Sequence, residues 1–488
     1  MAPISCKVLT TCIAGLLSAG VGAASFHTST LLDPVHYSSG DIIVRDVAVI
    51  GGGSSGTYGT IKLKDLGKSV ILVEKEARLG GHVNTYFDPG SGTPIDYGVQ
   101  AFWNLTVALD YFARFDIPLV DYSFAESRTE YADFRTGQLL PNFTYSSDLS
   151  KYAEQLHKFP ELDYSWNISY PVPEELLMSF GDLITTYGLE DEVWGMHSIL
   201  DGVANPADIL DSVTLNIFKW LDNGYIAGAE GADRTTQKPE HYNAELYEKA
   251  LAELQTDSSV LLSSTVVAAD RQCTYGGQGV CVAVRTSDGY KLILAKKLLI
   301  SIPPVPWNMQ PFGLDPNEQF LFHKWNYSSY YTGLLANSGL DPNVTYYNTG
   351  ANTSYNLPVL PGAYFFQPTN VEGIMMYWYS GPDLLSQEQV EADVLDQLRR
   401  ITSPTQTPDF VAFGDHSPFK LVVSADDIAD GFYQDLMALQ GRHNTWYTGA
   451  AFATHNSVEL WNYTSSLMPG LLDSLEYIGS DCHLATLV

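Results

Sequence analysis

Basic residues are scarce in this chain of 488 residues. It carries 26 lysines and arginines against 56 acidic residues, which gives a formal net charge of −30. A surface this negative repels the phosphate backbone of nucleic acids and the headgroups of anionic lipids, so we expect neither as a partner. Extended acidic runs are also missing, so the charge is dispersed along the chain and does not form an acidic tail.

Long apolar runs are missing too, and the one near the start is short. Val8 to Leu17 is interrupted by two threonines and falls below the roughly 20 apolar residues that a membrane span needs. A single lysine precedes it and small residues up to Ala24 follow, which is the order of a secretory signal peptide. We predict that residues 1–24 are removed, that the protein is secreted, and that it has no membrane anchor.

Cysteine is rare, with five in the chain, two of them in the predicted signal peptide. Cys273 and Cys281 flank a glycine-rich turn between two β-type runs, so we predict a disulfide across a hairpin. Cys482 is then left unpaired. Sequons of the type Asn-x-Ser/Thr exceed the roughly three expected by chance, which agrees with export and predicts N-linked glycans. They begin at Asn104, Asn142, Asn167, Asn326, Asn343, Asn352 and Asn462.

The sequence does contain enough apolar surface for large folded domains. Hydrophobic residues make up 45% and aromatic residues 12%, which excludes a disordered chain. The first regular pattern is a β-branched run from Ile42 to Ile50, a glycine cluster, a helical segment from Thr57 to Leu66 and a buried strand from Val70 to Val73. This β-α-β order predicts a parallel sheet.

Two blocks whose composition differs from that of the β-α-β segments interrupt the rest of the chain. Residues 105–240 are aromatic-rich and punctuated by proline, and residues 310–385 form a second irregular aromatic block. We predict an α/β fold (α+β overall), with a discontinuous Rossmann-like domain over 40–104, 241–310 and 441–475 and an inserted substrate domain over 105–240 and 311–440. Further elements are predicted as helices over 241–255, Gln387–Ile401 and from about Ser457, and as strands over Val260–Ala268, Val280–Arg285, Leu292–Ile302 and Asn444–Gly449.

The segment between the first strand and the first helix reads Gly51-x-Gly53-x-x-Gly56. The first glycine permits a tight turn, the second lets a pyrophosphate approach the backbone, and the third allows close packing of helix on strand. Unpaired amides at the start of the helix, around Ser55, add an anion site. Glu74 ends the second strand at the spacing of a ribose-binding carboxylate, and we assign Lys75 beside it to the same site.

The same residues also read Gly52-Gly53-Ser54-Ser55-Gly56, which matches the nucleophile elbow of a hydrolase. Such an elbow needs preceding strands and an upstream oxyanion loop, whereas about two dozen residues of the mature chain precede this motif. A hydrolase would also leave Glu74 unexplained. We therefore favour a dinucleotide site.

A second glycine pair follows the ribose carboxylate, in Arg78-Leu-Gly80-Gly81-His82. With the first motif and Glu74, it resembles the flavin-containing amine oxidase superfamily, whose members bind FAD in a discontinuous Rossmann-type domain beside a substrate domain. The resemblance implies FAD as cofactor. It also implies that Val266 meets the adenine and that Gly449, Asn456 and Ser457 form the closing motif, where a helix N-terminus stabilises the reduced flavin.

Segments 95–103, 110–115 and 431–441 resemble a fungal branch of that superfamily that includes β-cyclopiazonate dehydrogenase, which forms a carbon–carbon bond by oxidative cyclisation. The resemblance implies FAD and oxidation. It does not give the substrate, because pockets diverge faster than cofactor sites.

The sequence departs from the superfamily pattern in three places. His82 stands where most members have an arginine, and we interpret it as a hydrogen-bonding group near the phosphates. Covalent attachment of the flavin, through His82 or His455, is the alternative. Tyr330 or Tyr331 stands where many members hold a lysine near flavin N5, so a dehydrogenase or slow oxidase fits as well as an amine oxidase. The closing segment 453–456 lacks the tyrosine of an amine cage. Aromatic residues that either line a pocket or belong to the core are Trp103, Tyr331, Trp378 and Tyr379.

We predict FAD-dependent oxidation of a small organic molecule, aromatic or resembling a secondary metabolite, with hydride transfer to flavin N5 across the face lined by Gly98, Val99 and Gln100. His455 is predicted to accept a proton, Gln100 to orient the substrate, and Tyr331 to complete the catalytic set. The electron acceptor is oxygen or another oxidant, and no metal site is predicted. An oxidative cyclisation is one form of this reaction. A redox-neutral FAD-dependent isomerase and a secreted amine oxidase are the alternatives.

Overall fold

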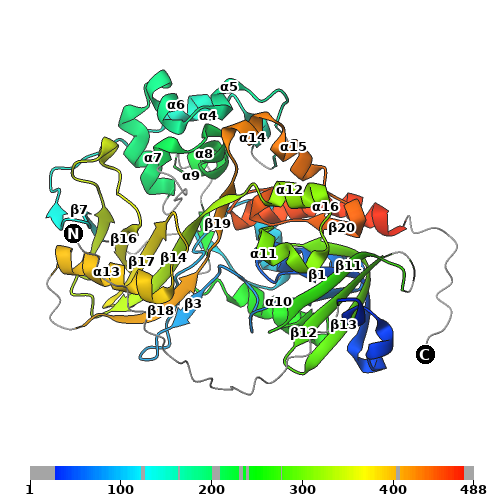
Figure 1. Cartoon of the computed structure of the whole chain (residues 1–488). Helices are drawn as coiled ribbons and strands as arrows, with labels where there is room; N and C mark the ends of the chain where they lie inside the picture. The colour runs from blue at the N-terminus through cyan, green and yellow to red at the C-terminus, as the bar shows by residue number, and fades with distance from the viewer. Residues whose placement is uncertain are drawn as a thin grey trace, which may run out of the picture.

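The structure is a computed structural model of the chain, and it describes residues 28–121, 127–162, 165–166, 168–200, 209–229, 235–237, 241–275, 277, 279–402 and 407–476. The predicted signal peptide, the sequon at Asn167 and the thiol of Cys482 lie outside these residues. Figure 1 shows two large sheets side by side, with a group of helices above the junction between them.

The first sheet has the order β10-β2-β1-β13-β12-β11, with β20 beside β13. Strands β1, β2, β10, β13 and β20 run parallel, and β11, β12 and β13 are joined as antiparallel neighbours. The predicted strands at Ile42–Ile50 and Val70–Val73 are confirmed. The strands are β1 (Ile42–Ile50), β2 (Val70–Val73), β10 (Val260–Leu261), β11 (Thr265–Cys273), β12 (Gly279–Thr286), β13 (Gly289–Ile300) and β20 (Thr445–Tyr447).

Helices cover one face of this sheet because their apolar sides meet the valines and leucines of β1, β2 and β13. They are α2 (Ser54–Asp65), α10 (Glu245–Thr256), α16 (Ser457–Glu476) and α3 (Thr106–Arg114). Tyr111 of α3 lies edge-on to Trp461 of α16, with ring centroids 5.0 Å apart. The segment after residue 104 therefore packs on the nucleotide side before the chain enters the other lobe, a difference from the boundary drawn from composition.

The second sheet has the order β18-β14-β17-β16-β15-β7-β8, with β19 beside β14. Most of it comes from 310–385, so the prediction of an irregular block there is wrong. The strands of the sheet that come from this block are buried on both faces, and such strands lack the polar–apolar alternation that makes a strand visible in sequence. The strands of the whole sheet are β7 (Arg128–Asp133), β8 (Gln138–Leu139), β14 (Asn326–Ala336), β15 (Val344–Asn348), β16 (Gly362–Pro368), β17 (Ile374–Gly381), β18 (Asp409–Asp415) and β19 (Phe419–Val422).

Helix α13 (Gln387–Ile401), predicted with the same bounds, covers the outer face of the second sheet. The other face turns towards the first sheet, where Leu334 and Met376 meet Ile95. Short strands connect the two lobes: β3 (Thr85–Phe87) with β4 (Pro94–Asp96), and β5 (Phe102–Trp103) with β9 (Thr235–Gln237) and β6 (Val120–Asp121).

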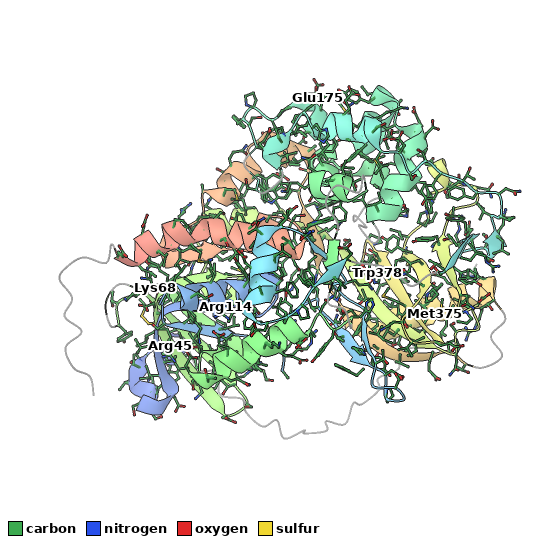
Figure 2. All side chains as sticks on the ribbon, turned by 180° about the vertical axis from the view of Figure 1, so that it is seen from behind. Arg45, Lys68, Arg114, Glu175, Met375 and Trp378 are labelled. Carbon is green, nitrogen blue, oxygen red and sulfur yellow. A yellow bond between two sulfur atoms is a disulfide. The ribbon has the colours of Figure 1, made fainter. Side chains whose placement is uncertain are left out.

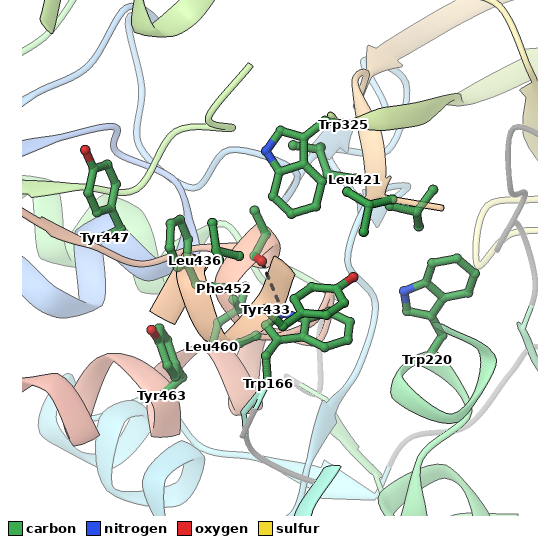
Figure 3. Close-up of a cluster of buried hydrophobic side chains, with 14 of the residues drawn as sticks. Trp166, Trp220, Trp325, Leu421, Tyr433, Leu436, Tyr447, Phe452, Leu460 and Tyr463 are labelled. Carbon is green, nitrogen blue, oxygen red and sulfur yellow. Dashed lines mark hydrogen bonds between the residues drawn. The ribbon is translucent and has the colours of Figure 1, made fainter. Parts of the chain in front are cut away.

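The helices above the junction are anchored by an aromatic core drawn in Figure 3. Trp166 stacks on Tyr433 with ring centroids 3.9 Å apart, and its Nε1 donates to the carbonyl oxygen of Ala451 at 3.1 Å. This contact ties the helices to the segment that leads into α16. They are α4 (Ser150–Leu156), α5 (Glu174–Leu177), α6 (Phe180–Tyr187), α7 (Val193–Leu200), α8 (Thr214–Trp220), α9 (Asn223–Ala229), α14 (Ala425–Ala429) and α15 (Phe432–Met437).

The predicted disulfide is confirmed: Cys273 of β11 is bonded to Cys281 of β12, with Cα atoms 5.6 Å apart. Between residues 28 and 476, none of the helices that the structure describes is both long and apolar enough to cross a membrane.

Candidate functional site

The glycine motif lies where parallel strands β1, β2 and β13 end together. Gly51 has a φ of +100°, and a Cβ built on Gly56 would lie 1.9 Å from the carbonyl oxygen of Gly51, so both positions require glycine. Ser301 at the end of β13 donates its hydroxyl to the carbonyl oxygens of Ile50 and Gly51, at 2.9 and 3.0 Å. No side chain caps α2, whose first turn includes the buried Ser55, so its first amides are available to a phosphate.

The predicted ribose carboxylate is held at the same edge. Glu74 is 8% exposed, and its two carboxylate oxygens accept the backbone N–H of Gly52 at 2.5 Å and of Glu76 at 2.8 Å. Lys75 differs from the prediction, because its side chain is 77% exposed and lies 3.8 Å from Glu76 at the surface. Val266 is the second residue of β11 and lies two positions after Ser264, whose amide donates to the Glu74 carbonyl oxygen at 2.9 Å.

The second glycine pair closes onto the first. The amide of Gly80 donates to the carbonyl oxygen of Gly52 at 2.8 Å, and a Cβ built on Gly81 would lie 3.0 Å from the Cα of Gly53. Side chains larger than hydrogen would therefore close the cradle between the two turns. This arrangement suits a pyrophosphate bound by backbone amides, which an acidic chain needs because it has few cations to spare.

The hydrolase alternative fails on geometry. Ser54 Oγ lies 2.9 Å from Trp461 Nε1 and 3.2 Å from the Tyr247 hydroxyl, and neither group is a base that removes a serine proton at neutral pH. Burial also raises the pKa of Tyr247. Ser54 is therefore a packing residue of the helix start.

The segment Gly98–Gln100 runs beside the second glycine turn. The amide of Val99 donates to the His82 carbonyl oxygen at 3.2 Å, and a Cβ on Gly98 would lie 2.0 Å from that oxygen. Asn243, which sequence reasoning missed, donates its Nδ2 to the carbonyl oxygens of Val99 and Gln100 at 3.0 and 2.9 Å. Gln100 Nε2 lies 2.8 Å from the Met376 sulfur, so this segment bridges the two sheets.

The closing motif also meets the carboxyl ends of the first sheet. Gly449 has a φ of +98°, and a Cβ built there would lie 2.9 Å from the carbonyl oxygen of Ser301. Asn456 caps α16 by accepting the Val458 amide on Oδ1 at 2.9 Å. Ser457 is 7% exposed and is the first residue of α16, so the positive end of this helix is directed at the site.

Two histidines meet where the lobes join, although 334 positions separate them in sequence. The rings of His82 and His416 stack with centroids 4.3 Å apart. His416 Nε2 lies 2.8 Å from Asn84 Nδ2, and Arg78 donates to Asn84 Oδ1. His82 is exposed, and desolvation of its ring together with the nearby charges of Arg78 and Lys75 lowers its pKa to about 4.

His455 lies beside the same cluster, with its ring centroid 4.4 Å from Phe419. The backbone N–H of Lys420 donates to His455 Nε2 at 3.0 Å, so this nitrogen carries a lone pair and the neutral ring has its proton on Nδ1. Burial holds the pKa of His455 well below its usual value. This hydrogen bond occupies the lone pair of Nε2, so the arrangement does not favour the predicted role of His455 as a proton acceptor. Nδ1 is a buried donor without a partner among the described residues.

Tyr331, predicted as a catalytic residue, faces away from this cluster. Its hydroxyl is bonded to the backbone of Leu385, and its ring packs under α13. Because neighbouring residues of a strand point to opposite faces, Tyr330 is the residue that faces the site. It stacks on Phe419 at 4.6 Å. Tyr379 also faces α13, where it donates to Asp393.

Trp378 of β17 lies on the site-facing side, towards the centre of the molecule in Figure 2. Its ring centroid is 4.9 Å from Phe365 and 6.2 Å from Tyr330. Trp378 Nε1 is buried without a partner among the described residues, which leaves it as a donor for a bound molecule. Trp103 lies apart from this wall and packs edge-on against Tyr225 at 4.5 Å.

Four histidines with lowered pKa values predict a stability that depends on pH. Burial lowers the pKa of His82 and of His197 to about 4, and holds that of His416 and His455 well below 6.5. Between pH 6.5 and 4 the unfolded chain therefore binds more protons than the folded one, so stability falls as the pH falls through this window. We expect the thermal midpoint to be several degrees lower at pH 5 than at pH 7. Equal midpoints at both values would contradict the neutral state of these rings.

The comparisons with known proteins agree with this site. Residues 49–115 match the family model of an NAD(P)-binding Rossmann-like domain. The chain is 39% identical over 468 residues to the FAD-dependent oxidoreductase pigF of Monascus ruber, with 94% of this chain and 99% of pigF covered. The chain belongs to this family of fungal FAD-dependent oxidoreductases. β-Cyclopiazonate dehydrogenase of Aspergillus oryzae is 33% identical over 452 residues, with 89% of this chain and 94% of that protein covered.

A solved structure with low sequence identity to this chain shares its fold. A CLA-producing fatty acid isomerase from P. acnes superposes with a TM-score of 0.66 at 16% identity, covering 87% of this chain and 98% of the isomerase chain. The resemblance drawn from the glycine motifs is confirmed, as are the α/β fold, the oxidoreductase class and FAD as cofactor. The residues present fit this cofactor, because the Gly53–Gly81 cradle admits a pyrophosphate, Glu74 suits the ribose and His455 Nδ1 is an unused donor.

Replacement of Glu74 by alanine is expected to weaken FAD binding about 10- to 100-fold, because charge-assisted hydrogen bonds contribute about 1.5–3 kcal/mol each. The carboxylate has a second role, since it accepts the Gly52 amide and so shapes the glycine turn. The measurement is flavin absorbance per protein after dialysis. Glu76→Ala is the matched control, because its side chain is 61% exposed; equal flavin retention in both variants would contradict the ribose assignment.

Proposed function

We propose that this oxidoreductase removes a hydride and a proton from a small, largely apolar organic molecule bound between the second sheet and the Gly98–Gln100 segment. The observation that supports this is the aromatic face of the second sheet, where Tyr330, Phe365 and Trp378 adjoin the histidine cluster. An aromatic or polycyclic substrate fits such a wall. Because one relative is named β-cyclopiazonate dehydrogenase, we include an oxidative cyclisation among the reactions to test.

The cofactor, when bound, supplies the chemistry of taking up two electrons. The chain's own groups orient the substrate and hold the cofactor. Gln100 is fixed by Met376 and by the backbone clamp of Asn243, which places its amide between the lobes to orient a substrate. His455 Nδ1 and the N-terminus of α16 supply hydrogen-bond donors where negative charge develops on reduction. A tyrosine at position 330 in place of a lysine favours a dehydrogenase or slow oxidase over a fast oxidase.

Anaerobic mixing of the purified yellow protein with a panel of aromatic and polycyclic metabolites, including β-cyclopiazonate, tests the proposal. Lasting loss of flavin absorbance supports net oxidation, and readmission of air shows whether oxygen is the acceptor. A redox-neutral isomerase is the second candidate, because the fold is shared with a fatty acid isomerase. Product formed without lasting loss of absorbance would establish that candidate and overturn net oxidation. Bleaching confined to simple amines would instead favour an amine oxidase.

The two histidines considered for covalent attachment differ in the structure. His455 Nε2 is engaged by the Lys420 amide, whereas His82 is exposed. We propose that the flavin is held without a covalent bond, by the two glycine turns. Acid precipitation then releases all yellow colour to the supernatant. Colour that stays with the precipitate of the wild type but not of His82→Ala would establish a His82 link.

We propose that the chain is secreted and carries N-linked glycans. The disulfide of Cys273 and Cys281 suits an oxidising compartment. Enzymatic removal of N-glycans from protein secreted by a fungal host should lower its mass; unchanged mass would contradict the proposal. Asn462 should stay unmodified, because it lies half-buried inside α16 and its sequon partner Thr464 is buried. The described sequon asparagines with exposed side chains are Asn104, Asn142, Asn326, Asn343 and Asn352.

A further inference from the structure

Lys420 is a lysine in the interior of the protein. It lies in β19, is 3% exposed and has a φ of +51°, a backbone conformation that is unfavourable for a residue other than glycine. Its Nζ lies 4.2 Å from the ring centroid of Trp220, which Figure 3 labels, and 5.7 Å from that of Phe419. The side chain is therefore placed between α8 and the histidine cluster.

No described carboxylate forms an ion pair with Lys420, and this sets it apart from Lys324. Lys324 Nζ also lies over an aromatic ring, 4.3 Å from the centroid of Phe320, but it pairs with Asp427 at 2.5 Å. A buried ammonium without a counter-ion is costly, so burial lowers the pKa of Lys420 well below its usual value. The lowered pKa favours the neutral amine, whose lone pair can accept a proton.

The neighbours of Lys420 connect it to the site. Its own backbone N–H occupies His455 Nε2, and the adjacent Phe419 ring contacts His455 at 4.4 Å and His82 at 6.1 Å. Oxidation by hydride loss also releases a proton, and His455 has no free lone pair to take it. Of the titratable groups on the elements around Lys420, His82 and His455 are neutral, and Lys219 of α8 donates to the Leu162 carbonyl oxygen at 2.5 Å.

We propose that the Lys420 amine is the proton acceptor of the oxidation, an inference that rests on the proposed function. In the step, the substrate loses a hydride, with both electrons of one C–H bond, to the flavin. A neighbouring C–H, N–H or O–H gives its proton to the Lys420 Nζ lone pair, and the electrons left behind form the new double bond. The flavin is reduced by two electrons, the substrate is oxidised by two, and the amine becomes an ammonium.

Nitroethane and its preformed anion, ethyl nitronate, separate the proton transfer from flavin reduction. Neutral nitroethane must lose a Cα proton to a base before it reduces a flavin, whereas the nitronate bypasses that step. We expect the flavin of the wild-type holoenzyme to be bleached anaerobically by both. In Lys420→Met the rate with nitroethane should fall about 100-fold or more, the size of a general-base effect, while the nitronate rate is retained. Lys420→Arg should behave as Lys420→Met, because an arginine keeps the charge but does not accept a proton.

Lys324→Met is the matched control, because it also removes a lysine from an aromatic ring, and it should keep both rates. Rescue of nitroethane oxidation in Lys420→Ala by added ethylamine would support the proposal further. Wild-type flavin that nitronate reduces but neutral nitroethane does not, or an unchanged nitroethane rate in Lys420→Met, would overturn it. Flavin that neither probe reduces, although dithionite does, would instead count against the proposed oxidation of organic molecules.

A second measurement needs neither turnover nor a variant. Reductive methylation with ¹³C-formaldehyde modifies neutral amines, so the pH dependence of labelling at Lys420 reports its protonation in the wild-type holoenzyme. We expect the labelling of the peptide containing Lys420, read by mass spectrometry, to reach half its maximum at a lower pH than that of the peptide containing Lys324. Half-maximal labelling at the same pH for both lysines would contradict a neutral Lys420.

Discussion

Replacement of Gly56 by alanine is expected to abolish retention of FAD. A Cβ at this position would lie 1.9 Å from the Gly51 carbonyl oxygen and 2.5 Å from Ser301 Oγ, so α2 must move away from the end of β1. That oxygen belongs to the backbone and cannot rotate aside. Because the first turn of α2 and the glycine turn bind the pyrophosphate together, a shift of the helix removes both sets of amides. We expect a loss of about 3 kcal/mol or more, over a hundredfold in affinity.

Flavin absorbance per protein after gel filtration measures this loss, and circular dichroism shows whether the variant remains folded. Gly40→Ala is the matched control, because the nearest atom to a Cβ there is Ser38 Oγ at 3.9 Å and its backbone is not in the left-handed region. Full flavin content in a folded Gly56→Ala protein would contradict the phosphate cradle.

The first sheet was predictable because its signals are local. The β-branched run of β1, the glycines after it and the short valine-rich β2 each follow from neighbouring residues, and helix α13 has its predicted bounds because a capping box at Ser386 starts it. The second sheet was not predictable in this way. Its central strands are buried on both faces, and the pairing in the sheet joins residues as far apart as Tyr131 and Tyr347.

The candidate site shows the same division. The glycines and Glu74 carry a spacing that the dinucleotide requires, so sequence alone identifies them. The contact of Asn84 with His416 joins positions 332 residues apart, and that of Asn243 with Val99 joins positions 144 apart, and no local pattern marks either. The choice between Tyr330 and Tyr331 depends on a single residue of register, which sequence does not fix but the pairing of β14 with β17 does.

Replacement of Arg271 by methionine is expected to destabilise the protein by about 3–5 kcal/mol, the cost of leaving a buried charge unpaired. Arg271 of β11 and Glu318 of α12 (Pro316–Phe322) have side chains 3% and 0% exposed and meet through two N–H···O bonds, at 2.7 and 2.5 Å. The Tyr447 hydroxyl of β20 donates to the same carboxylate at 2.6 Å. Burial raises the pKa of Glu318, but its bonds to Arg271 and Tyr447 outweigh burial and keep that pKa below its usual value, so removing the arginine leaves a buried carboxyl group without its counter-ion.

The substitution should also lower the flavin content of the protein. Tyr447 stands two residues before Gly449, so its displacement loosens the closing motif. The double variant Arg271→Met/Glu318→Gln distinguishes the buried charge from lost packing. Glutamine is neutral and still completes the capping box of α12, so the double variant should recover part of the urea midpoint and of the flavin content. Arg399→Met, which removes an exposed pair with Asp396, should leave both unchanged. A double variant less stable than Arg271→Met would contradict this explanation. It would show that the single variant loses stability through lost packing and hydrogen bonds, and not through an unpaired buried charge.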